Sequence, residues 1–388
     1  MTVLDEHRTV GQLEDALSDA SFFTRRGMHY PSFGSHPAMK ELRRGHTVGT
    51  RALTWNATGD ALISCGHDKI ARIWHPERTS LLKMDVSAST ELTGHADQIS
   101  AIAGHPTNPN FIATGALDKT VRLWDLRTKK STSTITTPGA NINLAYHPDG
   151  CVIAVGDKNE NVSLLDGDRG VFLHTIKNGT VDREEVCILY SPKINELAWS
   201  PDGSMLLLPM GSGNISFLRT PDTPASLISD PKEHCPWDLH PNWTRDLVRP
   251  THPAAIFCIK WDRSGRLVAT AAADSTINLW DAFDWTSRHI FSSFKFPSRS
   301  IDFSSDGEWL AAGGEDTEIS LVSACYDSLQ MSTASERIVH QIQVTATINT
   351  LAWHPFKPLL AYGGTETTAI YGSNTNTRST PIWLYSVP

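Results

Sequence analysis

One sequence pattern recurs along the chain and constrains the fold more than any other feature. The segment GHTVGTRALTWNATGDALISCGHDKIARIW begins at Gly45, and the segment GHADQISAIAGHPTNPNFIATGALDKTVRLWD begins at Gly94. Both contain Gly-His, an apolar alternation, a turn, a second alternation, Asp-Lys and a third alternation that reaches Trp. Weaker copies follow, and the equivalent positions of the seven copies are Trp55, Gly104, Tyr146, Trp199, Trp261, Phe303 and Trp353. Such a repeat predicts one structural unit per copy.

The spacing and the local pattern of the copies predict a closed ring of sheets. Successive copies lie 42 to 62 residues apart, and the shortest spacing matches a four-stranded propeller blade of about 40–45 residues. Short alternating segments such as ALTW and IARIW are typical of half-buried strands, whereas Asn-Ala-Thr-Gly-Asp and Ser-Pro-Asp-Gly are typical of turns. One such sheet cannot bury both of its faces alone. We therefore expect an all-β, seven-bladed β-propeller.

The two ends of the chain predict how the ring closes. The last copy finishes with PIWLYSVP, an alternating strand at the carboxyl terminus, and its sheet still needs a fourth, outer strand. The candidate is the segment from Met39 to Arg44, which lies just before the first Gly-His. We therefore expect the N- and C-terminal strands to pair in one blade and to close the ring without a covalent link.

The repeats resemble the WD40 family over roughly residues 40–388, which implies a seven-bladed WD40 propeller. This family builds a hydrogen-bonded His–Ser/Thr–Asp–Trp network inside a blade. The matching positions in the first, second and fifth copies are His46, Ser64, Asp68, Trp74, His95, Thr114, Asp118, Trp124, His252, Thr270, Asp274 and Trp280. The third, fourth and sixth copies lack the Gly-His and the Trp, although Asp157 and Asp316 remain at the tight turn.

Two segments fall outside the predicted blades, and each leaves two interpretations open. Residues 1–38 form an N-terminal extension that we expect to be largely flexible; its aromatic residues, with Arg25 and Arg26, would otherwise form a partner-binding tail. Within the propeller (39–388), a long insertion spans about 220–253 and contains Trp237 and Trp243. Indole rings in a polar loop either pack against a blade edge or contact a partner.

Composition excludes several classes of protein. The chain has 34 basic and 42 acidic residues and a net charge of −8, so RNA contact is expected to be indirect or weak. Its apolar runs are far shorter than the roughly 18 residues that a membrane span needs, and its amino terminus shows no secretory signal. The six cysteines form no CxxC pair, which fits reduced thiols in the cytosol or nucleus.

No residue set predicts catalysis, a cofactor or a metal site. The motifs GxSxG, HExxH, GxxxxGKS and GxGxxG do not occur, and His234, Cys235 and His240 match no zinc spacing. The Ser/Thr–His–Asp sets recur in several copies, as structural devices do, whereas a catalytic triad occurs once. Inner-strand segments such as ALTW, NLAY and ELAW are mainly small and apolar, so we do not expect an enzyme built on the central channel.

A narrower resemblance rests on segments that are not generic to the repeat. Residues 136–166 (TTPGANINLAYHPDGCVIAVGDKNENVSLLD) and 194–218 (INELAWSPDGSMLLLPMGSGNISFL) resemble the family of WD-repeat subunits of the THO complex. The resemblance implies a nuclear, non-enzymatic scaffold of the THO/TREX assembly, which couples transcription to mRNP assembly and nuclear mRNA export. It implies other THO subunits as partners, and no cofactor, membrane or small-molecule substrate.

One short motif keeps an alternative open. Trp124-Asp125-Leu126-Arg127 fits the WDxR box through which substrate receptors of cullin–RING ubiquitin ligases bind the propeller adaptor of the ligase. Arg127 would then contact that adaptor. Co-purification separates the two interpretations, because the adaptor and cullin would be lost on Arg127→Ala whereas THO subunits would stay.

Overall fold

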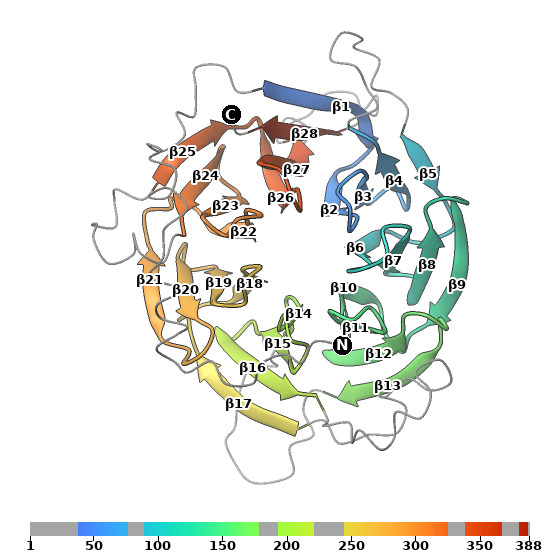
Figure 1. Cartoon of the computed structure of the whole chain (residues 1–388), viewed down its shortest axis with the longest axis horizontal. Coiled ribbons are helices and arrows are strands. Elements are labelled where there is room, and N and C mark those ends of the chain that lie inside the picture. The colour runs from blue at the N-terminus through green and yellow to red at the C-terminus, as the bar shows by residue number, and fades with distance from the viewer. Residues whose placement is uncertain are drawn as a thin grey trace, which may run out of the picture.

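The computed structural model describes residues 38–76, 89–177, 193–220, 244–324, 338–366 and 380–386. In these ranges the chain forms seven four-stranded sheets. Figure 1 shows the sheets as blades arranged in a ring, each with one edge strand nearest the centre. The predicted all-β, seven-bladed propeller is confirmed.

Each blade has an inner and an outer strand at its two edges. The inner strands are β2 (Thr50–Trp55), β6 (Ile99–Gly104), β10 (Asn141–Tyr146), β14 (Ala198–Trp199), β18 (Ile256–Trp261), β22 (Ser298–Phe303) and β26 (Ala346–Trp353). The outer strands are β5 (Thr90–Leu92), β9 (Lys130–Thr136), β13 (Phe172–Lys177), β17 (Thr244–Pro250), β21 (Ser287–Phe291), β25 (Ile338–Gln343) and β1 (Ala38–His46). All seven repeat positions predicted from the sequence are the last residues of their inner strands.

Two middle strands complete each blade. The second strands are β3 (Leu62–Gly66), β7 (Phe111–Ala116), β11 (Val152–Asp157), β15 (Met205–Pro209), β19 (Leu267–Ala272), β23 (Trp309–Gly314) and β27 (Leu359–Glu366). The third strands are β4 (Ala71–Trp74), β8 (Thr120–Asp125), β12 (Asn161–Asp166), β16 (Asn214–Arg219), β20 (Ile277–Asp281), β24 (Glu318–Ser323) and β28 (Thr380–Ser386). We number the blades 1 to 7 in the order of their inner strands.

Blade 7 closes the ring by joining the two ends of the chain. β1 pairs antiparallel with β28, and Leu42 lies opposite Ile382. Both side chains are buried, so β1 adds apolar contacts as well as ladder hydrogen bonds. The predicted closure by pairing of the N- and C-terminal strands is confirmed, since the order of this sheet is β1-β28-β27-β26.

The segment expected as an insertion at about 220–253 contributes a strand to blade 4. Its last part forms β17, which pairs with β16 from Asn214 opposite Pro250 to Arg219 opposite Thr244. The sequence TRDLVRP carries charges and a proline, as strands at a sheet edge often do. It therefore lacks the apolar alternation that predicts a strand, and the structure shows that it pairs with β16. Residues 221–243 of this segment, with Trp237 and Trp243, lie outside the described residues, as does most of the extension 1–38.

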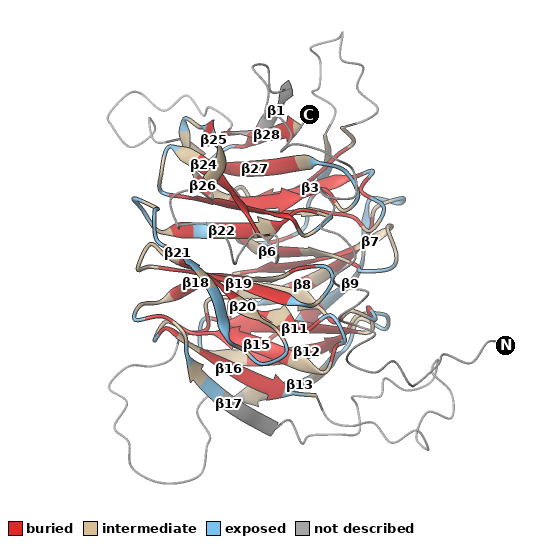
Figure 2. Cartoon of the chain, turned by 60° about the vertical axis from the view of Figure 1, so that its left-hand side comes forward, coloured by how far each residue is buried: buried red, intermediate tan, exposed pale blue. Residues whose placement is uncertain are grey.

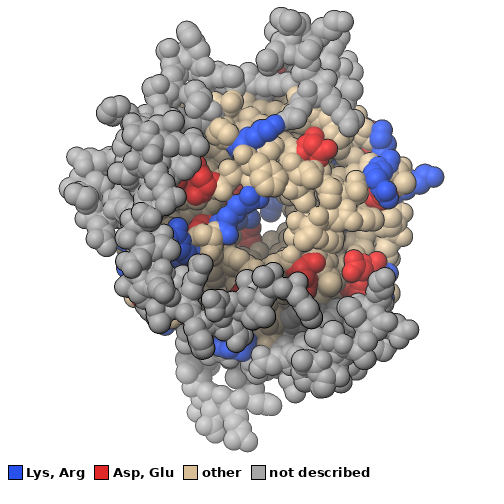
Figure 3. Space-filling model, viewed as in Figure 1, with Lys and Arg blue, Asp and Glu red and all other residues tan. Residues whose placement is uncertain are grey.

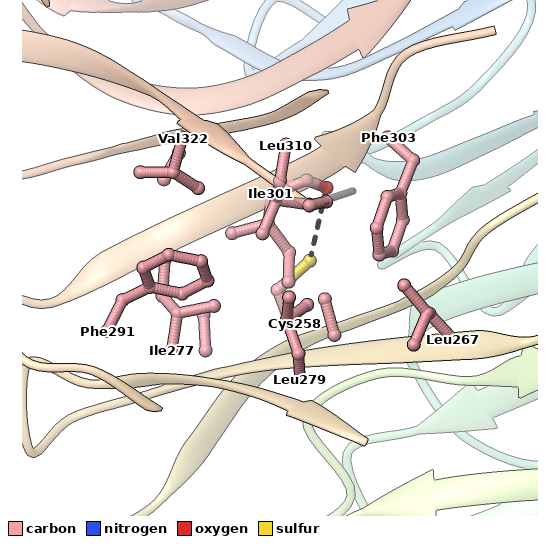
Figure 4. Close-up of a cluster of buried hydrophobic side chains, with 13 residues drawn as sticks. Cys258, Leu267, Ile277, Leu279, Phe291, Ile301, Phe303, Leu310 and Val322 are labelled. Carbon is pink, nitrogen blue, oxygen red and sulfur yellow. Dashed lines mark hydrogen bonds between the residues drawn. The ribbon is translucent and has the colours of Figure 1, made fainter. Parts of the chain in front are cut away.

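The core lies between neighbouring blades. The second strands β11, β19 and β23 are buried along their whole length, whereas the outer strand β9 alternates between exposed residues and residues that are half-buried or, at Ile135, buried. Figure 2 shows the same gradient, with exposed residues on outer strands such as β21. In Figure 4, Ile277 and Phe291 of blade 5 pack against Val322 and Leu310 of blade 6. Each interface buries the face that a single sheet leaves open.

Candidate interaction surfaces and the central channel

The predicted His–Thr–Asp–Trp set of blade 2 forms one connected network. His95 Nδ1 lies 2.9 Å from an Asp118 carboxylate oxygen, and His95 Nε2 lies 2.8 Å from the hydroxyl of Thr114. Trp124 donates its Nε1–H to the same hydroxyl at 2.8 Å. Asp118 also accepts the backbone N–H of Ala96 at 2.8 Å. The network therefore ties the connection that enters the blade to the turn between its middle strands.

Blades 1 and 5 repeat this geometry. His46 bonds Asp68 at 2.7 Å and Ser64 at 2.8 Å, and Trp74 donates to Ser64 at 2.9 Å. In blade 5 the equivalent distances are 3.0 Å, 2.8 Å and 2.9 Å, and the residues are His252, Asp274, Thr270 and Trp280. The structure thus brings each of the three predicted sets together.

Electrostatics keep these histidines neutral. Burial lowers the pKa of His95, and the hydrogen bond and charge of Asp118 offset that effect only in part; the pKa values of His46 and His252 are lowered for the same reason. Burial alone would raise the pKa of Asp68, but its hydrogen bonds and charge interactions with His46 and Arg72 lower it to about 2. Each network therefore pairs a neutral imidazole with a carboxylate.

The same burial argues against catalysis by these sets. The side chains of Ser64, Thr114 and Thr270 are fully buried, and each hydroxyl already accepts an indole N–H. A nucleophile must reach its substrate, and these hydroxyls face the blade interior. Satisfied buried polar groups stabilise and orient a fold, which accounts for the networks.

The central channel is a cavity of about 510 Å³ lined by the inner strands of six blades and, in blade 4, by residues 195–197 just before β14. In Figure 3 it opens at the centre of the face, with Lys and Arg side chains on one side of the opening. The charged side chains in its lining are Arg51, Glu196, Lys260 and Arg299. The expectation of mainly small and apolar inner strands therefore holds for part of the ring and is wrong for blade 1, which carries Arg51, and for blades 4, 5 and 6.

A cluster of charged side chains lies where blades 4, 5 and 6 meet the channel. Lys260 Nζ lies 3.2 Å from Glu196 Oε1, and Glu196 Oε2 accepts the backbone N–H of Ile259 at 3.3 Å. Burial raises the pKa of Asp302 to about 6, although the charge of Lys260 opposes the shift. The negative charge of Glu196 raises the pKa of Lys260, which stays protonated. Sequence analysis missed this cluster, yet Lys260 and Asp302 occupy the next-to-last position of their inner strands, where four other blades carry alanine.

Channel side chains also bond the backbone of the next inner strand. Asp302 accepts the N–H of Trp353 at 2.7 Å, Ser300 accepts that of Leu351 at 3.1 Å, and Thr350 accepts that of Leu53 at 3.2 Å. An inner strand is a sheet edge with unpaired N–H groups, and these side chains satisfy some of them. The polar lining of the channel is therefore partly structural.

The described residues hold no assembled metal-binding cluster. No group of three or more His, Cys, Asp or Glu side chains in these ranges is placed to hold a metal ion. Burial raises the pKa of Cys258 well above its usual range, so its thiol is a poor nucleophile at neutral pH. His234, Cys235, His240, Arg25 and Arg26 lie outside the described residues.

Arg127 of the WDxR box makes a local ion pair. Its side chain is 66% exposed, and its guanidinium lies 3.0 Å from the carboxylate of Asp125. Blade 3 repeats the arrangement with Arg169 and Asp166 at 2.6 Å, in the same connection between the third and outer strands. Arg127 is therefore accessible, whereas Trp124 and Asp125 of the box are buried. The Asp–Arg pairing is also a recurring way to close this turn.

Known proteins with the same repeats identify the family of this chain. The fold and the repeated networks define a WD40-repeat β-propeller, and the model of the WD domain, G-beta repeat, matches residues 39–75, 87–125, 245–281 and 285–323. THO complex subunit 3 of Arabidopsis thaliana is 31% identical over 331 residues, which are 85% of this chain and 91% of that protein. The chain belongs to the family of THO complex subunit 3.

Two further similarities show how widely this architecture is shared. The WD repeat-containing protein AAC3 of Dictyostelium discoideum is 26% identical over 332 residues, which are 82% of this chain and 62% of that protein. The solved beta-propeller domain of Myceliophteria thermophila Cps50 (Swd1) superimposes with a TM-score of 0.66 at 17% identity, over 90% of this chain and 99% of that one. At that identity the superposition supports the fold alone. Within the described ranges no helix is long and apolar enough to cross a membrane.

Proposed function

We propose that this chain is a non-enzymatic, nuclear scaffold subunit of a THO/TREX assembly. It docks on other THO subunits and so takes part in coupling transcription to mRNP assembly and nuclear mRNA export. The observation that carries the proposal is the 31% identity to THO complex subunit 3 over 85% of the chain. Fold alone does not identify a function, so the weight rests on this family membership.

The physical character of the ring supports a role in holding partners. The polar networks that recur in three blades are buried and saturated with internal hydrogen bonds, and the channel cluster pairs Lys260 with Glu196. A rigid ring presents two faces and a rim, and large assemblies use such surfaces for several contacts at once. RNA contact in this proposal is indirect or weak, because the chain carries a net charge of −8.

Purification of the tagged, full-length protein from nuclear extract tests the proposal. The extract is treated with nuclease, so that only protein contacts remain, and the retained proteins are identified by mass spectrometry. We expect THO subunits to stay bound in stable amounts. Their absence, or their loss on nuclease treatment, would contradict a direct scaffold role.

The same purification separates the ubiquitin-ligase alternative. A ligase receptor would retain the propeller adaptor and cullin, and Arg127→Ala would release them. Arg169→Ala is the matched control, because Arg169 makes the equivalent ion pair in blade 3. We expect neither substitution to change the retained THO subunits.

The segments outside the described residues enter the same test. A version that lacks residues 1–37 removes Arg25 and Arg26, and the double substitution Trp237→Ala, Trp243→Ala changes the 220–253 segment. Either segment is a partner contact if its change releases a THO subunit. If all subunits remain, contact is made by the ring.

A further inference from the structure

We propose that the face of the propeller over blades 6, 7 and 1 docks an acidic protein segment that carries one apolar anchor side chain. The proposal rests on the scaffold role and deepens it, because it supplies the class of partner and the surface. Three neighbouring features carry it. They are an apolar pocket on blade 7, an arginine at the channel mouth on each flanking blade, and an exposed apolar residue beside each arginine.

The pocket on blade 7 has room for one side chain. Its volume is about 140 Å³, and its apolar lining includes Val344, Ala346, Ile348, Tyr362 and Trp383. Cavities of roughly 150 Å³ with apolar walls accept a molecule of the size of benzene. The pocket therefore fits the ring of a phenylalanine or the branched end of a leucine.

Two arginines flank blade 7 at the mouth of the channel. Arg51 is the second residue of β2 and Arg299 is the second residue of β22, so they occupy equivalent positions on blades 1 and 6. Both are exposed and line the channel. Arg299 bonds Glu315, with Nε 3.2 Å from Oε1, whereas Arg51 makes no ion pair or side-chain hydrogen bond within the described residues. Arg51 therefore has its guanidinium available for a carboxylate.

The pocket and the channel mouth are continuous along β26. Ile348 lines the pocket, and Asn349, the next residue, lines the channel between the two arginines. Asn349 is held in place by hydrogen bonds from its amide to Thr50 and Thr365, both at 3.0 Å. A segment with its apolar side chain in the pocket would thus bring the following residues to the guanidinium groups.

Exposed apolar residues extend the same surface. Val48 is 58% exposed and Phe296 is 49% exposed, and each stands three residues before an arginine, in the connection from an outer to an inner strand. These connections, like Val344–Ala346 of the pocket, lie on one face because strand direction alternates within every blade. Aromatic residues and Arg are enriched in the cores of protein interfaces.

The chemistry favours a protein segment over a nucleic acid. A guanidinium binds a carboxylate with two parallel hydrogen bonds, and the apolar pocket adds a site that a phosphate backbone cannot use. Glu315, Asp316 and Glu318 lie in and beside the blade 6 turn behind Arg299. These carboxylates repel a uniformly anionic polymer, whereas a protein segment confines its acidic residues to the channel side.

Fluorescence anisotropy with a defined peptide tests the docking site. The probe is fluorescein-labelled Gly-Ser-Phe-Gly-Asp-Asp-Asp, titrated with the full-length protein at low salt. We expect saturable binding that weakens at least fivefold when the probe phenylalanine is replaced by alanine, and that disappears when its aspartates are replaced by lysines. The double variant Arg51→Glu, Arg299→Glu should weaken binding at least tenfold, and Ala346→Trp, which fills the pocket, at least fivefold.

A matched control separates this site from charge in general. Lys129→Glu with Lys130→Glu reverses two exposed charges, one just before β9 and one at its first residue, on the opposite face. It should change the affinity less than twofold. Melting curves check that every variant is folded. Equal binding of the lysine probe, equal loss in both double variants, or tighter Arg51-dependent binding of a ten-nucleotide oligouridylate would each overturn the proposal.

The nuclear purification distinguishes failure of this site from failure of the scaffold role. If THO subunits remain on the wild type and on the variant with Arg51→Glu, Arg299→Glu and Ala346→Trp combined, the docking site is wrong and the scaffold role stands. If the peptide binds as expected but no THO subunit is retained by the wild type, the surface stands and the scaffold role is wrong.

Discussion

The hydroxyl of Thr380 donates to the backbone carbonyl oxygen of His46 at 2.9 Å, although the two residues stand 334 positions apart in the chain. The side chain of the same histidine bonds Ser64 and Asp68 in blade 1. His46 therefore closes blade 7 with its main chain and holds blade 1 with its ring. Closure of the propeller and the network of its first blade therefore share one residue.

Leu42 tests how much the closing strand contributes to stability. It is buried in a cluster with Leu53 and Trp74 of blade 1 and Ile382 of blade 7. We expect Leu42→Ala to lower the free energy of unfolding by about 2–5 kcal/mol, because it leaves a cavity at the junction. Urea denaturation measures the change, and Ile290→Ala on the outer strand β21, with a half-exposed side chain, should cost less than about 1 kcal/mol. If both substitutions lowered the free energy of unfolding by the same amount, the contacts of Leu42 at the junction would contribute no more stability than those of an outer strand.

Asp118 tests the blade networks. It accepts hydrogen bonds from His95 and from the N–H groups of Ala96 and Thr120, so Asp118→Ala should cost about 1–3 kcal/mol. Asp316 lies at the corresponding turn of blade 6 and accepts the N–H of Thr317, without a histidine. Asp316→Ala is therefore the control, with an expected cost below about 1 kcal/mol. Differential scanning calorimetry compares the two, and matching losses would mean that the histidine adds nothing.

Gly150 tests a contact between blades 2 and 3. Its φ is +87°, and a Cβ at this position would overlap the ring of His105 from the neighbouring blade. Gly307 has a φ of +74°, and its Cβ would lie 3.7 Å from the nearest atom, an Asp262 oxygen. Both alanine substitutions place a side chain in the left-handed region, so the further loss in Gly150→Ala, about 1–3 kcal/mol, reports the clash.

A rescue experiment completes this test. Adding His105→Ala to Gly150→Ala removes the ring that the new Cβ meets. The double variant should recover part of the stability, measured as a positive coupling in a double-mutant cycle. Strict additivity of the two substitutions would rule out the clash as the cause.

Asp302 predicts a distinct pH dependence. Its pKa is raised to about 6 from a reference of 3.8, so between about pH 4 and pH 6 the folded chain binds more protons at this site than the unfolded chain. Ionisation of Asp302 therefore removes stability as the pH rises through 6. Asp302→Asn cannot ionise and keeps an oxygen that can accept the N–H of Trp353. Its free energy of unfolding relative to wild type should rise from pH 4 to pH 7 and then level off.

The buried histidines also change stability with pH, so the effect of Asp302 must be measured as the difference between Asp302→Asn and wild type. Their lowered pKa values have the opposite sign of effect, since the unfolded chain binds protons more readily below about pH 6.5 and acid destabilises the fold. This contribution is common to Asp302→Asn and wild type, and it cancels when their urea denaturation curves are compared at each pH. A difference that does not vary with pH would place the pKa of Asp302 in its ordinary range.

Local pattern determined much of this protein. The apolar alternation and the turns at seven copies sufficed to predict seven blades, and the predicted copies end at the last residues of the inner strands, such as Trp55 and Trp353. Strand pairing at the closure was predictable because PIWLYSVP and the segment from Met39 to Arg44 were each one strand without a partner. Such signals are local, since they depend on which residues alternate along one strand and which begin a turn.

Tertiary structure alone decided what meets across the ring. Glu196 and Lys260 are 64 residues apart and pair only because blades 4 and 5 pack side by side, and the pocket on blade 7 exists only where β25 ends beside β26 and β28. The sequence also did not predict β17, because a charged edge strand has little apolar alternation. This strand is positioned by its hydrogen bonds to β16. Apolar alternation along a strand predicts on which face of the strand a side chain lies. Which side chain of another blade it meets depends on ring closure and on the lengths of the loops.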